Sequence, residues 1–249
     1  MKVIALIPAR MNSSRFPGKP MAKILGKPMI GHVYDKVSQS PELSMTAVAT
    51  CDEEIFDYIT SLGGNAVMTS KSHERASDRC AEALLKLENK NGIEYDIVVM
   101  VQGDEPLTHP RMIFEALQPF NEDPNTKVVN LLGSIKNTKE FEDRNCIKVV
   151  CDINSNAIYF SREAIPTQFI STETPKGKQV CIIPFARDFL LEYTEMKQTP
   201  LEIAESIDML RVLENGFKVK MVKTEYQTQA VDTQEDLKKV ERILESRNE

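Results

Sequence analysis

Short apolar segments alternate with amphipathic segments in the N-terminal part of the chain. The apolar segments are rich in β-branched residues, as expected of strands, and they are Val3–Ile7, Thr46–Ala49, Ala66–Met68 and Ile97–Val101. The segments between them space their apolar residues three or four positions apart, as helices do, and they are Met29–Val37, Glu53–Leu62 and Arg79–Leu87. Alternating strands and helices form βαβ units. The sequence therefore predicts an α/β fold with a mixed, mostly parallel sheet flanked by helices.

The pattern changes after about Pro124, where strands follow one another across short turns with few helices between them. The predicted strands are Val128–Leu132, Cys146–Cys151, Ala157–Phe160 and Val180–Phe185. Such strands favour antiparallel pairing, so we expect a smaller, partly antiparallel lobe at approximately residues 125–190. Helical spacing returns at Leu201–Leu213 and Thr233–Leu244, on either side of a strand at Val219–Val222. A chain of 249 residues can hold this lobe inside a single domain, 1–249.

Composition narrows the class of protein and its partners. Hydrophobic residues make up 41% of the chain and charged residues 27%, which is ordinary for a globular cytosolic protein. The apolar runs are far shorter than the roughly 20 residues of a membrane helix, so we expect a cytoplasmic protein without a membrane partner. The formal net charge of -6 argues against a nucleic-acid partner, because nucleic-acid binding requires clustered lysine and arginine.

Cysteine and histidine give little sign of a metal site or of a nucleophile. The five cysteines are an odd number without a CxxC pair, and the three histidines show no HxxxH or HExxH spacing. We therefore expect reduced, structural thiols. The sequence also lacks a GxSxG motif for a nucleophilic serine. The type of catalysis that the sequence still allows is positioning and charge neutralisation, on which phosphoryl and nucleotidyl transfer depend.

A cluster of cations and hydroxyls directly follows the first predicted strand. It consists of Arg10, Ser13, Ser14, Arg15 and Lys19. The carboxyl end of a parallel strand lies at the crevice where α/β proteins bind ligands. Arginine offers forked donors and lysine a compact charge, and both suit a triphosphate. The spacing matches neither a P-loop nor a G-x-G-x-x-G turn. Charge alone favours a solvated basic loop equally well.

Two aspartates are candidate ligands of Mg²⁺. Asp104 follows the buried strand Ile97–Val101 and a glycine, and Asp232 directly precedes the last predicted helix. Mg²⁺ is commonly held by one or two carboxylates together with substrate phosphates and water. An ordinary turn residue is the alternative for Asp104, and a helix N-cap is the alternative for Asp232.

With these segments in view, the sequence resembles the 3-deoxy-manno-octulosonate (KDO) cytidylyltransferases over nearly its whole length. The residues that carry the resemblance are Pro8-Ala9-Arg10, Ser13–Pro20, Gly26–Ile30, Ser77-Asp78-Arg79, Val101–Pro106, Tyr159–Arg162, Leu210–Leu213 and Val231-Asp232-Thr233. The resemblance implies a fold like that of the nucleotide-diphospho-sugar transferases and a homodimer formed through the smaller lobe. It also implies a cytoplasmic role in making lipopolysaccharide or capsule.

The reaction implied by the resemblance uses CTP. A hydroxyl of an acidic sugar attacks the α-phosphate and pyrophosphate leaves, with Mg²⁺ held by the residues that match Asp104 and Asp232. The nucleotide-binding residues implied are Arg10, Ser13, Arg15, Lys19, Ser77, Arg79 and Gln102. The catalytic residues implied are Lys19, Arg15 and Asp104. Cation and metal clamps suit this chemistry because negative charge grows on the departing pyrophosphate.

The chain departs from the family where the acceptor is expected to bind. An Arg-His-Leu-Gly-Ile-Tyr-like strand is replaced by Lys178–Ile183, and a Glu-Gln pair is replaced by Asp208-Met209. The candidate acceptor-binding residues are therefore Gln179, Ile183, Asp208 and Met209. Loss of polar partners changes which hydroxylated substrate is accepted. The leading prediction for the acceptor is KDO or a KDO-like 3-deoxy-2-keto sugar acid. The alternative acceptors are another nonulosonate or a small phosphonate, and the alternative function is nucleotide binding without catalysis.

Overall fold

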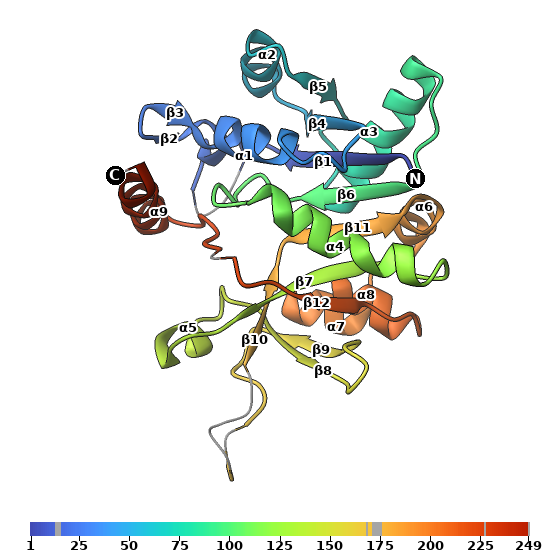
Figure 1. Ribbon diagram of the computed structural model, residues 1–249, viewed down its shortest axis with the longest axis vertical. Coiled ribbons are helices and arrows are strands. Elements are labelled where there is room, and N and C mark those ends of the chain that lie inside the picture. The colour runs from blue at the N-terminus through green and yellow to red at the C-terminus, as the bar shows by residue number, and fades with distance from the viewer. Residues whose placement is uncertain (13–15, 168, 171–175, 227, 249) are drawn as a thin grey trace. The chain divides into compact units, whose positions relative to one another are not determined.

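The computed structural model describes residues 1–12, 16–167, 169–170, 176–226 and 228–248. The chain divides into two compact units (Figure 1). The first unit comprises Met1–Phe114 and Gln227–Glu249, and the second comprises Glu115–Tyr226. The lobe predicted at approximately residues 125–190 falls inside the second unit. In the part of the chain that is described, no helix combines the length and the apolar character needed to cross a bilayer.

A parallel sheet forms the centre of the first unit. Strand β1 (Val3–Ala9) pairs with β6 (Ile97–Val101) on one side and with β4 (Met45–Thr50) on the other, and β5 (Asn65–Met68) pairs with β4. Every residue of β1 and of β6 is buried, as expected of strands covered on both faces. Three helices pack on the sheet: α1 (Met29–Ser38), α2 (Glu53–Ser61) and α3 (Ala76–Asn91). This arrangement confirms the predicted α/β fold.

The C-terminal segment of the chain returns to the first unit. Helix α9 (Gln234–Asn248) packs through Val240 into a cluster that includes Ile24 and Met29. Ile24 belongs to a short hairpin, β2 (Lys23–Ile24) and β3 (Lys27–Pro28), which follows the 3₁₀ turn η1 (Lys19–Met21). The hydrophobic face of α9 therefore fixes the chain that precedes it, including Asp232, on the first unit.

The second unit contains a mixed sheet in the order β12, β7, β10, β8, β9. Among the described residues of this sheet, only the β12–β7 pair is parallel, which confirms the predicted partly antiparallel lobe. These strands are β12 (Lys220–Lys223), β7 (Val129–Ser134), β10 (Gly177–Val180), β8 (Lys148–Cys151) and β9 (Ala157–Ser161). The remaining elements are β11 (Ile182–Ala186), α5 (Thr138–Glu142), α6 (Arg187–Glu195), α7 (Pro200–Glu205) and α8 (Met209–Glu214). Helix α4 (Pro110–Glu122) begins in the first unit and ends in the second.

Two predicted elements are each divided in the structure. The strand predicted at Val180–Phe185 is split at Cys181 into β10 and β11. The helix predicted at Leu201–Leu213 is split into α7 and α8, because Ser206 adopts the left-handed conformation with φ 53°. The helices α4, α5 and α6 were not predicted.

Candidate active site

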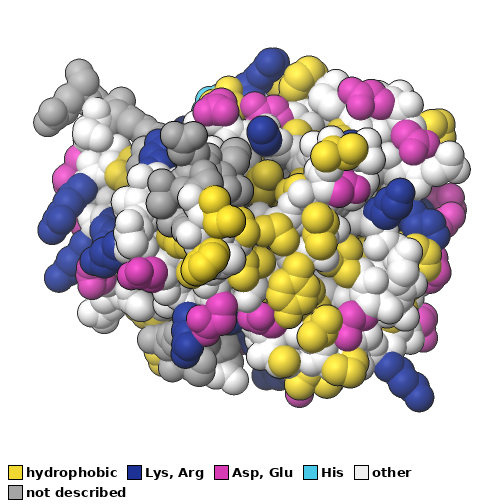
Figure 2. All heavy atoms as spheres, turned by 90° about the horizontal axis from the view of Figure 1, so that it is seen from below, with side chains coloured by type: hydrophobic (Ala, Val, Ile, Leu, Met, Phe, Trp, Pro, Cys, Tyr) yellow, Lys and Arg dark blue, Asp and Glu magenta, His cyan; other side chains and the backbone are white. Residues whose placement is uncertain are grey.

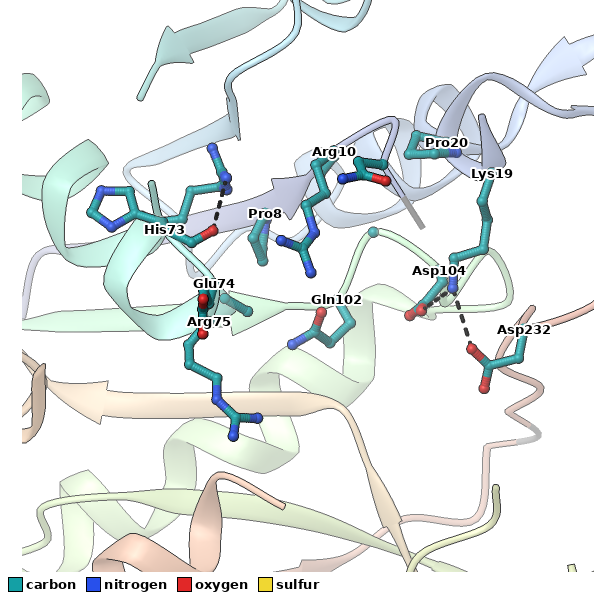
Figure 3. Close-up of a pocket in the computed structure, with 15 residues that line it drawn as sticks. Pro8, Arg10, Lys19, Pro20, His73, Glu74, Arg75, Gln102, Asp104 and Asp232 are labelled. Carbon is teal, nitrogen blue, oxygen red and sulfur yellow. Dashed lines mark hydrogen bonds and ion pairs between the residues drawn. The ribbon is translucent and has the colours of Figure 1, made fainter. Parts of the chain in front are cut away.

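A pocket of about 310 Å³ lies at the carboxyl ends of β1 and β6 in the first unit. The segments that line it follow these two strands, precede α3 and precede α9. Its charged and amide side chains are Arg10, Asn12, Lys19, His73, Glu74, Arg75, Arg79, Gln102, Asp104 and Asp232. Figure 3 shows Lys19 and the two aspartates at one end, and His73, Glu74 and Arg75 at the other. The edge of the sheet at which the sequence predicts ligand binding therefore carries a polar, charged cavity.

Lys19 lies between the two aspartates (Figure 3). Its Nζ is 2.6 Å from Oδ2 of Asp104 and 3.4 Å from Oδ1 of Asp232. The side chains are 13%, 26% and 20% exposed, respectively. Burial by itself lowers the pKa of Lys19, but the charges and hydrogen bonds of Asp104 and Asp232 outweigh it and raise the pKa above 10.5. Lys19 is therefore a cation at physiological pH.

Backbone contacts bring these side chains together from distant parts of the sequence. The N–H of Val231 donates to the carbonyl oxygen of Asp104 at 3.0 Å, which places the next residue, Asp232, beside Asp104. Gly103 allows the end of β6 to approach β1, because a Cβ there would lie 3.0 Å from the carbonyl oxygen of Pro8. Pairing of the aspartates thus depends on the docked C-terminal segment and on a glycine.

A backbone hydrogen bond joins the described ends of the cationic loop. Gly18 N–H donates to the carbonyl oxygen of Met11 at 2.9 Å, and Gly18 has a φ of 73°, which favours glycine. Lys19 follows in η1, whereas Arg10 directly precedes Met11 and is exposed. The predicted residues Ser13 and Arg15 lie outside the described residues, so their roles stay predictions.

The predicted residues at the start of α3 have different surroundings. Arg79 lines the pocket but is only 3% exposed, and its guanidinium donates to Oγ1 of Thr69 and to the carbonyl oxygen of His73. It therefore also holds the segment that carries Arg75. Ser77 is 1% exposed, and no described residue partners its hydroxyl. Gln102 lines the pocket.

Four polar pocket residues were missed: Asn12, His73, Glu74 and Arg75. His73 was considered only for histidine metal motifs, which it does not match. The ring of His73 hydrogen-bonds to Glu82, which also accepts from Lys86 and from the backbone of Ser70. A useful signal was available, because three titratable residues directly precede an amphipathic helix at the end of a βα connection.

The candidate acceptor residues belong to the second unit. Gln179 donates through Nε2 to Oδ1 of Asn130 at 2.6 Å. Ile183 and Met209 are 3% and 1% exposed, and the backbone carbonyl of Asp208 accepts from the hydroxyl of Tyr193 at 3.0 Å. Their assignment to acceptor binding stays a prediction.

The residues in the pocket fit a divalent cation. Two carboxylates already converge on one cation, the ammonium of Lys19, and both remain partly exposed to the pocket. Mg²⁺ prefers oxygen ligands and usually takes one or two carboxylates together with phosphate oxygens. Asp104 and Asp232 supply that number.

The parallel sheet and the pocket of cations and carboxylates at its edge indicate the nucleotidyltransferase class of α/β proteins. The sequence model of the family described as Cytidylyltransferase matches residues 4–237, and the chain belongs to this family. The 3-deoxy-manno-octulosonate cytidylyltransferase of Trichlorobacter lovleyi is 42% identical over 96% of this chain and 97% of its own. The protein of the same name from Fusobacterium nucleatum is 41% identical over 100% of this chain and 99% of its own.

Solved structures agree with this assignment. A CMP:2-keto-3-deoxy-manno-octonic acid synthetase complexed with CTP is 35% identical, with a TM-score of 0.90 over 99% of this chain and 100% of that chain. A cytidylyltransferase from Leptospira borgpetersenii shares the fold at 18% identity, with a TM-score of 0.64 over 99% of this chain and 87% of that chain. The resemblance inferred from sequence motifs is confirmed.

Proposed function

We propose that the protein transfers CMP from CTP to KDO and releases pyrophosphate. The observation that carries this proposal is the convergence of Lys19, Asp104 and Asp232 in a cationic pocket at the sheet edge. The full-length relatives named as 3-deoxy-manno-octulosonate cytidylyltransferases and the CTP-bound structural neighbour support both substrates.

The pocket suits an in-line displacement at phosphorus. The acceptor hydroxyl forms a bond to the α-phosphorus while the bond to the pyrophosphate oxygen breaks. Arg10 and Lys19 attract the triphosphate and stabilise the charge that grows on pyrophosphate. Mg²⁺, held by Asp104 and Asp232, would supply further positive charge to the phosphate oxygens. Because Asp104 and Asp232 raise the pKa of Lys19, its ammonium is charged when the nucleotide binds.

A product assay tests the proposal. Purified protein is incubated with CTP, Mg²⁺ and one acid from a panel of KDO, another nonulosonate and a small phosphonate. Release of pyrophosphate together with CMP-KDO is the expected result. A product formed with another acid and none with KDO would show that the other acid, and not KDO, is the acceptor. CTP binding in calorimetry without turnover on any acid would indicate a nucleotide-binding protein without catalysis.

We also propose that the protein is a cytoplasmic homodimer that serves lipopolysaccharide or capsule synthesis. A reaction that consumes CTP requires a compartment that supplies it. Several large hydrophobic side chains of the second unit are exposed, namely Ile153, Ile158, Leu201 and Ile203. Figure 2 shows hydrophobic side chains gathered on one face of the molecule. Exposed apolar surface supports an interface. Light scattering that gives a monomer mass at all concentrations would contradict the dimer.

A further inference from the structure

Asp52 occupies the position before the first residue of α2, where an aspartate ordinarily caps its own helix. A side chain at this position usually accepts a hydrogen bond from a backbone N–H in the first helical turn. In this structure Asp52 makes no such side-chain bond. Its Oδ2 instead accepts the N–H of Met11 at 2.8 Å, across 41 positions of sequence. The carboxylate therefore serves the cationic loop and not the helix that follows it.

Met11 is the residue at which the two ends of this loop meet. Its N–H is bound by Asp52, and its carbonyl oxygen accepts the N–H of Gly18 at 2.9 Å. Arg10 directly precedes Met11 and Lys19 directly follows Gly18, and both line the pocket. One side chain from the end of the neighbouring strand β4 thus fixes the point from which both cations project.

Asp52, which anchors the loop at Met11, is itself held by the sheet. The backbone N–H of Asp52 donates to Oγ1 of Thr50 at 3.1 Å, and Thr50 is the fully buried last residue of β4. The thiol of Cys51 lies 3.6 Å from the same oxygen that binds Met11. Since β4 pairs with β1 up to Thr50 and Ala9, the strand register determines how far Asp52 stands from Met11.

We propose that Asp52 is a positioning residue for the nucleotide site, acting through the backbone of Met11 on Arg10 and Lys19. This inference rests on the proposed use of CTP. Asp52 is not among the residues that line the pocket, so its effect passes through the loop. Arg10 and Lys19 lose less conformational entropy on binding triphosphate when their backbone is fixed beforehand, and small displacements of catalytic groups are costly.

The test uses three variants of the full chain. Asp52→Ala removes the acceptor, Asp52→Asn keeps a side-chain oxygen that can accept from Met11, and Glu53→Ala removes a neighbouring exposed acid of the same helix. Hydrogen exchange at the Met11 amide is measured without ligand. CTP affinity is measured by calorimetry with Mg²⁺, and kcat and KM are measured by pyrophosphate release.

Loss of the anchor has a defined pattern of effects. In Asp52→Ala we expect exchange of the Met11 amide to rise at least about tenfold, the KM for CTP to rise about tenfold and kcat to fall by a similar factor. Asp52→Asn is expected to restore most of each quantity, and Glu53→Ala to match the unmodified protein. Rescue by asparagine separates the hydrogen bond from the charge of Asp52.

Two results would overturn the inference. The first is Met11 exchange and CTP affinity in Asp52→Ala equal to those of the unmodified protein. The second is an asparagine variant as impaired as the alanine variant. If the unmodified protein binds no CTP, the proposed function fails, whereas the exchange of the Met11 amide still decides whether Asp52 anchors the loop.

Discussion

Two clusters of charged side chains differ in burial and in the geometry of their contacts. In the second unit, Arg211 donates to both carboxylate oxygens of Glu202, at 2.8 and 2.6 Å, and the side chains are 4% and 0% exposed. The guanidinium also donates to the carbonyl oxygen of Met196 at 3.3 Å and lies 4.6 Å from the ring centre of Tyr193. In the first unit, Lys19 makes one short and one long contact with carboxylates that face a pocket.

The difference separates a structural ion pair from a functional one. A forked guanidinium on a buried carboxylate has fixed geometry, and loss of either partner leaves an uncompensated charge in the core. A lysine ammonium between two partly exposed carboxylates can exchange them for a phosphate, and the carboxylates can exchange the ammonium for a metal ion. Arg211 and the three residues of the Lys19 cluster all lie in motifs that carry the family resemblance. Their burial and contact geometry show which cluster is available for chemistry.

Removal of Arg211 is expected to have the largest effect on stability. Arg211→Met leaves the Glu202 carboxylate buried without its cation, which costs about 3–5 kcal/mol of unfolding free energy. Urea unfolding followed by circular dichroism measures this loss. The matched control is Arg144→Met, because Arg144 and its partner Glu163 are 76% and 66% exposed, and its loss is expected to cost less than about 1 kcal/mol. Equal losses in the two variants would contradict the distinction.

Neutralising Asp104 should affect activity and leave the fold intact. Asp104→Asn keeps the size of a side chain that is 26% exposed but removes the charge that faces Lys19. We expect turnover in the pyrophosphate assay to fall about 10²–10³-fold, the usual range for loss of one electrostatic group. The control is Asp57→Asn on the exposed face of α2. Turnover of Asp104→Asn equal to that of the control would exclude Asp104 from the site.

Removal of Lys19 tests whether its two carboxylates fit a metal. In Lys19→Met, Asp104 and Asp232 face each other without the ammonium that now lies between them. Mutual repulsion then favours a divalent cation, and we expect the affinity for Mn²⁺ without nucleotide to rise about tenfold. Titration followed by electron paramagnetic resonance measures it, with Lys19→Met plus Asp232→Asn as the control that cancels the gain. Unchanged affinity would mean that the aspartates do not form a cation site.

Much of the first unit could be predicted because its elements follow simple periodicities. The predicted strand Ile97–Val101 has the exact bounds of β6, and the predicted start of α2 at Glu53 is also correct. The incorrect predictions lie where tertiary contacts decide the boundaries of an element. The divided strand at Cys181 and the left-handed Ser206 interrupt patterns that remain apolar on both sides, so hydrophobic spacing alone gives no boundary there.

The residue types of the candidate site could be predicted from the sequence, but the contacts that hold these residues in place could not. Asp104 and Asp232 could be proposed because each lies close to the end of a predicted element, and Lys19 because it belongs to the cluster of cations that follows the first predicted strand. The hydrogen bond from Val231 to Asp104 could not be predicted, because it joins residues that are far apart in sequence. Asp52 is also poorly predicted from the sequence alone, because sequence rules indicate a helix cap. The register of β4 against β1 instead places its carboxylate where it accepts the N–H of Met11.

Glu82 is as exposed as the carboxylates of the Lys19 cluster, with its side chain 25% exposed beside the pocket segment. Burial by itself raises the pKa of Glu82, but hydrogen bonds from Lys86, from the backbone of Ser70 and from His73 outweigh it and lower the pKa from 4.5 to about 2. The folded pKa lies below the unfolded one. The stability that Glu82 contributes is therefore present above about pH 4.5 and is lost as the pH falls through about 2.

Glu82→Gln should consequently show the smallest effect, and one that depends on pH. We expect the variant to be less stable than the unmodified protein at about pH 6, and the difference in unfolding free energy to shrink as the pH falls below about 4.5. Urea unfolding at several pH values measures it. Lys86→Met, which removes one donor to the carboxylate, should shrink the pH-dependent part without abolishing it, because Ser70 and His73 remain. A difference that stays constant with pH would show that Glu82 acts through packing and not through its charge.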